Sequence, residues 1–331
     1  MGRVVTALVI GSLLLTGCGD SNATASRPAS SLTRVTIAMG YIANVQFAPF
    51  YVAQARGFYR RAGLDVHLQY GIEPNLLRLA STGRVDFVDS GGDEVLAAAS
   101  QGLHVRYVLT QYSRFPTAIF SLAQTGIRRP ADLRGHSIGI PGPYGASYVG
   151  LLALLRHYHI PTSGVSIKSI NFTQAQSVSH HRVDAAVGYA MNEPVQLRQQ
   201  GHKVNEIDVY HVANIAGAGI ATSTDEIAHH PGTVRAFVAA TIAGMKETLQ
   251  HPDQAFRIAE SAVPEIKAQP KIQRAVLFRA LDFWRAEKGH SLGWSNRNVW
   301  DTTARLLLLF KQIPHSVHAE RFFTNQFLPS G

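Results

Sequence analysis

Aromatic, amide and carboxylate side chains gather in a loop whose chemistry suits a flat, hydrogen-bonding molecule. Tyr189, Asn192 and Glu193 follow a predicted strand, and a carboxylate beside an amide can accept two hydrogen bonds from the edge of an amino-heterocycle. Glu193 also precedes Pro194, which suits the first turn of a helix, where the helix dipole favours a carboxylate. The sequence therefore predicts either a ligand contact or a helix start at Glu193.

A second loop, Pro141–Tyr148 (PGPYGASY), precedes a predicted helix that runs to residue 157. Gly142 allows a ligand to approach the backbone, and the unpaired N–H groups of a first helical turn attract electron-rich atoms. Tyr144 and Tyr148 offer flat faces for stacking. Ser147 either contacts the ligand or caps the helix. We expect this loop to form one wall of a binding site.

Further candidate residues follow strands in the first part of the chain. They are Asn44, Gln46, Phe47, Ser90, Asp93 and Tyr112. Asn44 and Asp93 have an alternative role, because Asn and Asp are also preferred helix caps. We predict that the set belongs to the same ligand-binding site.

The chain offers little for catalysis or metal binding. The histidine pairs 180–181 and 229–230 are neighbours in sequence, which point apart on a helix, and no third ligand has a useful spacing. No nucleophile stands at a recognisable distance from a base, and no G-x-G-x-x-G loop is present. We predict no catalytic residue, no cofactor and no metal, and so a binding protein rather than an enzyme.

Short strand patterns alternate with helical ones in two series, which begin near residues 34 and 137. This βαβ order predicts an α/β fold with mainly parallel sheets. Each series contains Arg-Val-Asp, at 84–86 and at 182–184, between a helix and a strand. A three-residue match can arise by chance, but its position favours two lobes built alike, with the ligand at the carboxyl ends of their strands.

About 300 residues remain after the N-terminal region, more than one hydrophobic core usually serves. We expect lobe 1 to comprise residues 34–120 and 221–331 and lobe 2 to comprise 121–220. The extended runs 116–122 and 219–222 would be the two crossover hinge segments. The helical region after residue 232 would pack on lobe 1.

The N-terminus resembles a bacterial lipoprotein signal peptide. Arg3 precedes an apolar stretch from Val4 to Leu15, and Cys18, the one cysteine of the chain, follows directly at the end of Leu-Thr-Gly. The stretch is too short to span a bilayer. We expect a signal peptide at 1–17, a lipidated Cys18 and a flexible linker at 18–33, although a buried thiol in a cytoplasmic helix is the alternative.

The formal net charge is +9, which would suit an anionic partner. The basic residues are scattered along the sequence and form no dense run, so we predict a solvated basic surface and no nucleic-acid partner.

Several motifs resemble the substrate-binding proteins of ABC importers in the NMT1/THI5-like and SsuA-like superfamily. They are GYIANVQFAPFYVAQARGFYRRAGLDV at 40–66, Asp132-Leu133-Arg134-Gly135, the block PGPYGASYVGLLALL from Pro141, and Asn192-Glu193-Pro194. Together they extend from about residue 33 to residue 252. Their wording is most similar to the groups assigned to thiamine-pyrimidine precursors and riboflavin-like heterocycles.

The resemblance implies a two-lobe periplasmic-binding-protein fold of type II, with the ligand in a cleft between the lobes. It also implies an ABC transporter permease and its ATPase as partners and an exported location, periplasmic or on the outer face of the cytoplasmic membrane. We expect a monomer. Alkanesulfonate, taurine or nitrate binding is an alternative, with Arg114 as the nearest cation for an oxyanion. An enzyme of thiamine-pyrimidine synthesis is another, but it would bring a cysteine-rich motif that this chain lacks.

Overall fold

The computed structural model describes residues 31–71 and 76–329. The expected signal peptide, Cys18 and most of the expected linker lie outside the described residues. From residue 32 onward the chain forms one compact unit, which contains two sheets. The sheets confirm the predicted α/β class.

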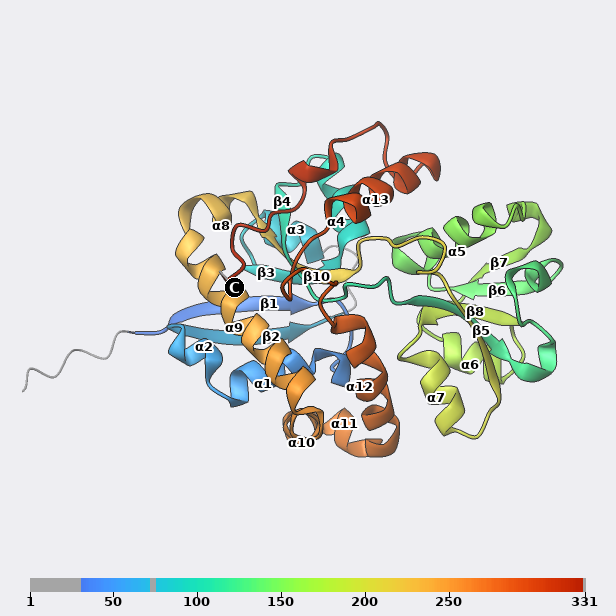
Figure 1. Cartoon of the computed structure of the whole chain (residues 1–331), viewed down its shortest axis with the longest axis horizontal. Coiled ribbons are helices and arrows are strands. Elements are labelled where there is room, and N and C mark those ends of the chain that lie inside the picture. Colours follow the sequence, from blue (N-terminus) through green and yellow to red (C-terminus); the bar gives the residue numbers. More distant parts are fainter. Residues whose placement is uncertain (1–30, 72–75, 330–331) are drawn as a thin grey trace, which may run out of the picture. The chain divides into compact units, whose positions relative to one another are not determined.

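Each sheet has five strands and the same internal order. The first is ordered β2-β1-β3-β10-β4 and the second β7-β6-β8-β5-β9 (Figure 1). The strands are β1 (Thr33–Met39), β2 (Leu64–Tyr70), β3 (Phe87–Gly91), β4 (Val105–Thr110), β5 (Thr117–Leu122), β6 (Ser137–Ile140), β7 (Ser166–Ser169), β8 (Ala185–Tyr189), β9 (Val204–Asp208) and β10 (Ala218–Ser223). We call the parts built on the first and second sheets lobe 1 and lobe 2.

Helices connect the strands and fill the C-terminal part of the described chain. The α-helices are α1 (Ala48–Ala55), α2 (Phe58–Arg61), α3 (Leu76–Ser81), α4 (Gly92–Ser100), α5 (Gly145–His157), α6 (Gln174–Ser179), α7 (Glu193–Gln199), α8 (Thr224–His229), α9 (Pro231–Gln250), α10 (Pro252–Ala262), α11 (Pro264–Ala268), α12 (Pro270–Trp284) and α13 (Arg297–Leu309). The 3-10 helices are η1 (Val45–Phe47), η2 (Ala123–Thr125), η3 (Pro130–Leu133), η4 (Thr162–Gly164) and η5 (Ala319–Arg321).

One strand in each sheet is antiparallel, and it is the first strand after the chain changes lobe. β5 runs antiparallel to β8 and β9, and β10 runs antiparallel to β3 and β4. The expected lobe boundaries at 120/121 and 220/221 therefore fall inside strands. The runs that we interpreted as hinge crossings are apolar because they are buried within the sheets. The chain crosses instead at 111–116 and 209–217, where the Phe115 N–H donates to Asn214 Oδ1 at 3.1 Å.

Alternating strand residues serve two cores, one on each face of the first sheet. Val35, Ile37 and Met39 of β1 pack in a cluster with residues of α1, α2, α9 and α12. Ala38 and Val88 face the opposite side, in a cluster with residues of α3, α4 and α13 that extends to α5 in lobe 2. This period of two is what a sheet with helices on both faces requires.

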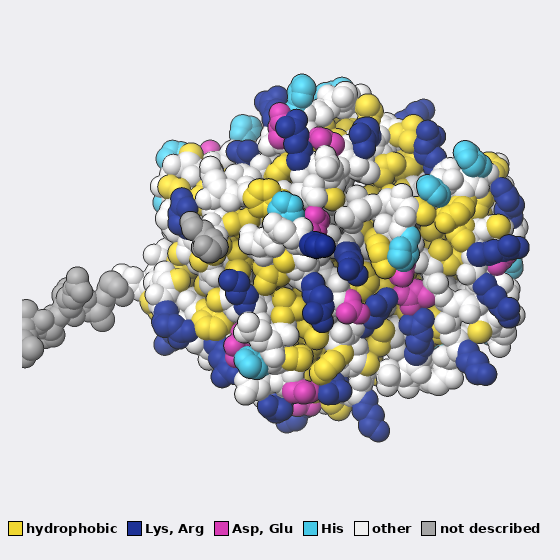
Figure 2. All heavy atoms as spheres, viewed as in Figure 1, with side chains coloured by type: hydrophobic (Ala, Val, Ile, Leu, Met, Phe, Trp, Pro, Cys, Tyr) yellow, Lys and Arg dark blue, Asp and Glu magenta, His cyan; other side chains and the backbone are white. Residues whose placement is uncertain are grey.

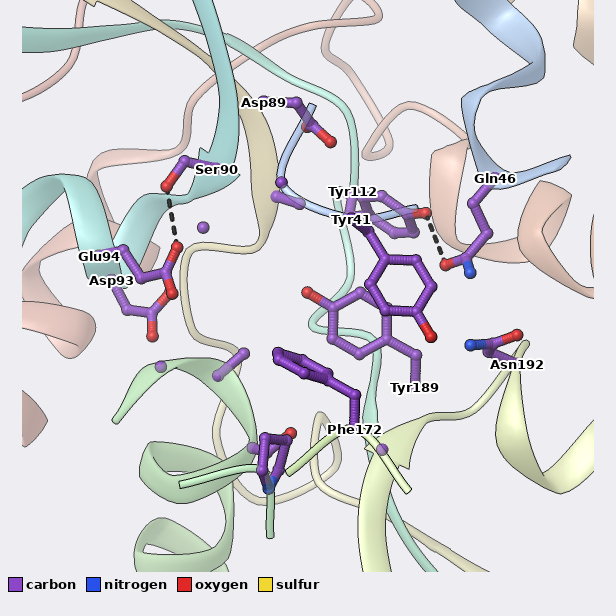
Figure 3. Close-up of a pocket in the computed structure, with 18 of the residues that line it drawn as sticks. Tyr41, Gln46, Asp89, Ser90, Asp93, Glu94, Tyr112, Phe172, Tyr189 and Asn192 are labelled. Carbon is purple, nitrogen blue, oxygen red and sulfur yellow. Dashed lines mark hydrogen bonds between the residues drawn. The ribbon is translucent and has the colours of Figure 1, made fainter. Parts of the chain in front are cut away.

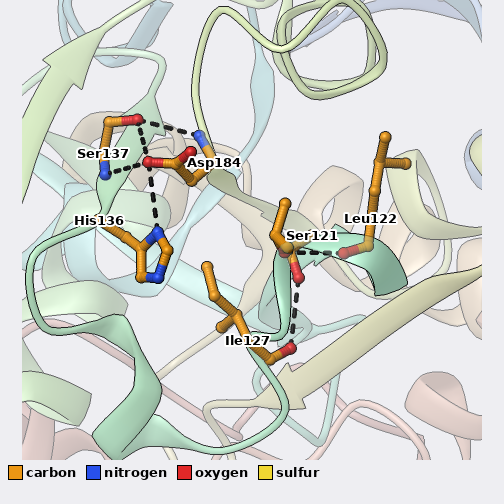
Figure 4. Close-up of polar contacts among 7 residues, drawn as sticks. Ser121, Leu122, Ile127, His136, Ser137 and Asp184 are labelled. Atoms are coloured by element: carbon orange, nitrogen blue, oxygen red, sulfur yellow. Dashed lines mark hydrogen bonds and ion pairs between the residues drawn. The ribbon is translucent and has the colours of Figure 1, made fainter.

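The Arg-Val-Asp repeat has the same structural role in both lobes. The Asp86 carboxylate accepts a hydrogen bond from the Thr36 N–H of β1 at 2.6 Å. In lobe 2 the Asp184 carboxylate accepts from the N–H and hydroxyl of Ser137 at the start of β6, at 2.8 and 2.7 Å (Figure 4). The hydrogen bond from the Ser137 N–H lowers the pKa of Asp184 most. The Ser137 hydroxyl and the neighbouring His136 lower this pKa further, so that it lies below its ordinary value. Each aspartate thus links the turn before its own strand, β3 or β8, to the neighbouring strand, β1 or β6.

The surface carries mixed side chains on the face drawn in Figure 2. Lys and Arg are spread over that face between acidic, histidine and apolar side chains. Within residues 31–71 and 76–329, no helix has both the length and the apolar character that a membrane span needs.

Candidate functional site

A cavity of about 190 Å³ lies between the two lobes, where the strand ends of both sheets meet. Gly40 and Tyr41 follow β1, and Asp89 and Ser90 end β3 in lobe 1. From lobe 2, Tyr189 ends β8, and further wall residues come from the starts of α5, α6 and α7. This is the location expected for ligands in open α/β sheets, at the carboxyl ends of the strands.

Aromatic rings occupy the middle of the cavity. Tyr41 of lobe 1 and Phe172 of lobe 2 lie with ring centroids 5.9 Å apart, and Tyr112 and Tyr189 lie 6.1 Å apart, again one from each side (Figure 3). Phe172 remains 41% exposed although it is a large apolar side chain. Burial raises the pKa of Tyr41 to about 12, so its hydroxyl stays protonated at physiological pH. Rings in this arrangement suit a planar ligand that stacks on them.

Amide groups lie at one end of the rings. Asn192 donates to Glu193 Oε1 at 3.0 Å and accepts from Gln196 at 2.7 Å. Gln46 accepts a hydrogen bond from the Tyr112 hydroxyl through its Oε1, at 3.4 Å, and its Nε2 takes part in no hydrogen bond among the described residues. Figure 3 shows the Gln46 and Asn192 side chains together, beside Tyr41. This end offers fixed amide donors and acceptors to the edge of a ring.

Glu193 lies in this end with both carboxylate oxygens engaged inside its own loop. Oε2 accepts from the Tyr189 N–H at 2.9 Å, while Oε1 accepts from Asn192. The side chain is buried, and burial raises its pKa. Glu193 is the first residue of α7, as one alternative predicted, and it lines the cavity, where the ligand contact stays a prediction.

Carboxyl groups lie at the opposite end. Asp89, Asp93 and Glu94 line the cavity, and Glu94 Oε2 accepts from the Ser90 hydroxyl at 2.9 Å. Burial raises the pKa of Asp89 to about 7 and that of Asp93 to about 8, and the Glu94 charge adds to both shifts. Burial also raises the pKa of Glu94, against the hydrogen bond from Ser90. Buried carboxyls without a cation nearby hold their protons more tightly.

Lobe 2 presents the start of α5 to this acidic end. The helix begins at Gly145 and has no side-chain cap, so its first N–H groups lack intrahelical partners. Gly145, Ala146 and Ser147 all line the cavity. Gly145 has a φ of +64°, and a Cβ atom there would lie 3.0 Å from Glu94 Oε1, so the two helix starts closely approach each other.

The structure brings most of the predicted site residues to the cavity. Those that line it are Gln46, Phe47, Ser90, Asp93, Tyr112, Tyr144, Ser147, Tyr189, Asn192 and Glu193.

Three predicted residues do not line the cavity. Asn44 caps η1, accepting the Gln46 N–H at 2.9 Å, which was its alternative role. Gly142 lies against the Tyr144 ring, where a Cβ would come within 2.3 Å of a ring carbon. Tyr148 belongs to α5, and its side chain packs against the hydrophobic core instead of lining the cavity.

Sequence reasoning missed several wall residues, chiefly Tyr41, Asp89, Glu94, Phe172 and Gln174. Asp89, Glu94 and Tyr41 adjoin residues that we did single out or follow a predicted strand, so the strand-end rule could have found them. Phe172 follows the short edge strand β7, and nothing in its local sequence marks it as a ligand contact.

The described part of the cavity wall is free of basic side chains. None of the described residues that line it is Arg, Lys, His or Cys. Arg114, the nearest cation for the alternative oxyanion ligand, does not line the cavity and lies over the Tyr210 ring, with its guanidinium carbon 5.9 Å from the ring centroid. In the described ranges, His, Cys, Asp and Glu form no group of three or more that could hold a metal ion.

Comparison with known proteins relates this chain to a protein family. Residues 44–255 match the family model described as NMT1/THI5 like. The riboflavin-binding protein RibY of Chloroflexus aurantiacus is 39% identical, and the match covers 99% of this chain and 98% of that protein. A 4-amino-5-hydroxymethyl-2-methylpyrimidine phosphate synthase of Legionella pneumophila is 26% identical over 90% of this chain and 93% of its own length.

A solved structure has the same fold. The alkanesulfonate-binding protein SsuA from Xanthomonas axonopodis pv. citri, bound to MOPS, superposes with a TM-score of 0.71 at 16% identity, covering 90% of this chain and 100% of that one. The two-lobe periplasmic-binding-protein fold is thereby confirmed.

Proposed function

Since the chain belongs to the NMT1/THI5-like family, we propose that it is an extracytoplasmic solute-binding protein that captures riboflavin or a closely related planar heteroaromatic and delivers it to an ABC importer permease and its ATPase. The observation that carries this proposal is the composition of the cavity wall. Aromatic rings lie there with amide and carboxyl groups, and none of the described wall residues is basic. Such a wall suits a flat ligand rich in hydrogen-bond donors.

The similarity to the RibY protein supports the choice of riboflavin. That protein is named for riboflavin binding, and it matches nearly the whole of this chain. The isoalloxazine ring of riboflavin is planar, and its pyrimidine edge carries two carbonyl acceptors around an N–H donor. Gln46 and Asn192 offer amide groups that match such an edge.

An oxyanion ligand fits the same wall poorly. Sulfonate and nitrate need Arg, Lys or a cluster of neutral donors, whereas Asp89, Asp93 and Glu94 here place carboxyl groups in the cavity. The likeness to the alkanesulfonate-binding structure concerns the fold. We therefore prefer the heterocycle.

An enzyme of pyrimidine synthesis is the competing class, because one relative carries that name. The chain supports the carrier function instead, because it lacks the cysteine-rich motif that this enzyme class would bring, and no Lys or His is among the described residues of the cavity wall. A carrier should return its ligand unchanged.

Calorimetry with the purified protein tests the proposed function. The ligands are riboflavin, hydroxymethyl- and formylamino-pyrimidines, thiamine, an alkanesulfonate, taurine and nitrate. We expect saturable binding of one riboflavin per chain, with the ligand recovered unchanged. Phe172→Ala should weaken binding by about tenfold, the order of a lost stacking partner. Tyr158→Ala, which removes a ring of similar exposure outside the cavity, should leave binding unaltered.

Two outcomes would reject riboflavin as the ligand. Tight sulfonate or nitrate binding that ignores Phe172→Ala would favour the oxyanion reading of the site. Chemical conversion of a bound pyrimidine would favour the enzyme.

The proposed membrane anchor is the lipidated Cys18, which rests on the sequence of the N-terminus. Metabolic labelling of producing bacteria with a fatty acid should mark the wild-type protein and leave Cys18→Ala unmarked. The variant should also keep its signal peptide, because processing at a lipoprotein site requires the cysteine. Label of equal strength in Cys18→Ala would show that the anchor is elsewhere or absent.

A further inference from the structure

The acidic end of the cavity holds acceptors that no described residue satisfies. Asp93 is 2% exposed and Asp89 is 7% exposed, and Oδ1 of each has no hydrogen-bond partner within the described part of the chain. Both line the cavity, together with Glu94. A buried polar atom without a partner costs about 1–3 kcal/mol. A ligand group that donates to these oxygens would recover that cost.

The facing wall offers donors. The N–H groups of Gly145, Ala146 and Ser147 belong to the uncapped first turn of α5, and the Ser147 hydroxyl lies with them. Glu94 lies close to Gly145 across the gap, as the 3.0 Å approach of a Cβ at that glycine shows. Acceptors on α4 thus face donors on α5 over a short distance.

A chain of hydroxyl groups fits this pairing, since every hydroxyl donates one hydrogen bond and accepts others. An ammonium group would suit the carboxyls of Asp93 and Glu94 but would meet the positive end of the α5 dipole. A phosphate would suit the start of α5 but would lie beside three carboxyl groups with no basic side chain on the described cavity wall. The two walls together select a neutral group that both donates and accepts.

The cavity also continues at this end. A second hollow of about 420 Å³, whose wall also contains Arg78, shares Ser90, Asp93, Glu94, Tyr144 and Gly145 with it. A ligand whose ring lies among Tyr41, Phe172 and Tyr189 therefore has room for a side chain that passes the acidic end.

We propose that the gap between the first turns of α4 and α5 is a subsite for a polyhydroxyl chain, which takes the ribityl group of riboflavin. This inference rests on the proposed function, because it assumes a flavin in the cavity. Asp93 and Glu94 accept from the hydroxyls, while the α5 N–H groups donate to them. The subsite makes the carrier selective for a flavin with a polyol chain over one without it.

Binding of three flavins by the purified protein, with its N-terminal segment retained, tests the subsite. Riboflavin has the polyol, lumiflavin has a methyl group in its place, and flavin mononucleotide adds a phosphate. We expect lumiflavin to bind at least about tenfold more weakly than riboflavin, as expected for one or two lost hydrogen bonds. Flavin mononucleotide keeps the polyol, so we expect it to bind more tightly than lumiflavin. Fluorescence quenching or calorimetry gives the three dissociation constants.

Variants that replace each carboxyl group by an amide link the selectivity to the two residues. Asp93→Asn and Glu94→Gln should each weaken riboflavin, leave lumiflavin unchanged, and so reduce the ratio of the lumiflavin and riboflavin dissociation constants. Asp225→Asn removes one charge from exposed α8 and should leave all three constants as they are.

The outcomes separate the subsite from the function. Lumiflavin binding as tightly as riboflavin and flavin mononucleotide to the wild-type protein would overturn the subsite while leaving the flavin carrier intact. Unaltered selectivity in both folded variants would overturn the roles given to Asp93 and Glu94. Binding of none of the three flavins would refute the proposed function, and the subsite with it.

Discussion

Replacing Glu193 by alanine is expected to weaken riboflavin binding by about ten- to a hundredfold. The buried carboxylate accepts the Tyr189 N–H and the Asn192 side chain at 2.9 and 3.0 Å. Without it, both groups lose their acceptor, and two residues of the cavity wall lose the contacts that orient them. The loss should appear in the dissociation constant measured by calorimetry, together with a lower melting temperature of the ligand-free protein.

Glu193→Gln provides the matched comparison. Its amide keeps one oxygen acceptor and turns the other position into a donor, so binding should fall by less than in the alanine variant. Glu260→Ala in α10, outside the cavity wall, should bind riboflavin like the wild type. If Glu193→Ala binds normally, the loop after β8 keeps its geometry without the carboxylate, and the positioning role is wrong.

The ligand-free protein is expected to lose stability as the pH rises from about 5 to about 8.5. Burial, aided by the Glu94 charge, raises the pKa of Asp93 to about 8 and of Asp89 to about 7, whereas an unfolded aspartate titrates near pH 4. Between these values the folded protein binds more protons than the unfolded chain, so the free energy of unfolding falls with rising pH. The contribution is complete below about pH 4 and is lost as the pH passes through the folded values.

Thermal melts over this pH range measure the effect. Asp93→Asn, which is neutral at every pH, should flatten the decline and melt above the wild type at pH 8.5. Asp225→Asn should keep the wild-type slope, because it removes an exposed charge. A wild-type melting temperature that stays constant between pH 5 and 8.5 would show that the acidic end is ionised without cost in the folded state.

Local sequence patterns predicted the strands and several residues of the cavity wall. Alternating apolar residues predicted β1, and the repeated Arg-Val-Asp predicted two similar series, in which Asp86 and Asp184 indeed make equivalent bonds to β1 and β6. The candidates after β3 and β8 reached the cavity because parallel strands end on the same edge of a sheet. These features depend on short-range periodicity and chain direction, which can be recognised from the sequence alone.

Other features needed the assembled fold. The runs at β5 and β10 read as crossings, but their neighbours in the sheets come from distant parts of the chain. Asn44 and Tyr148 are close in sequence to residues that line the cavity but do not line it themselves. Asn44 accepts a cap hydrogen bond, and Tyr148 packs against the core. The approach of Phe172 to Tyr41 joins residues of different lobes. Strand order and cross-lobe contacts are long-range, so no local pattern encodes them.

The sequence by itself determined the fold class, the two similar series and the aromatic, amide and carboxyl character of the strand-end loops, because periodicity and side-chain chemistry are properties of short segments. Only the tertiary structure decided that the amides of Gln46 and Asn192 lie across the rings from Asp93 and Glu94, and that the start of α5 faces the acids of α4. Those relations depend on how the two sheets meet, and the proposed selectivity of the cavity rests on them.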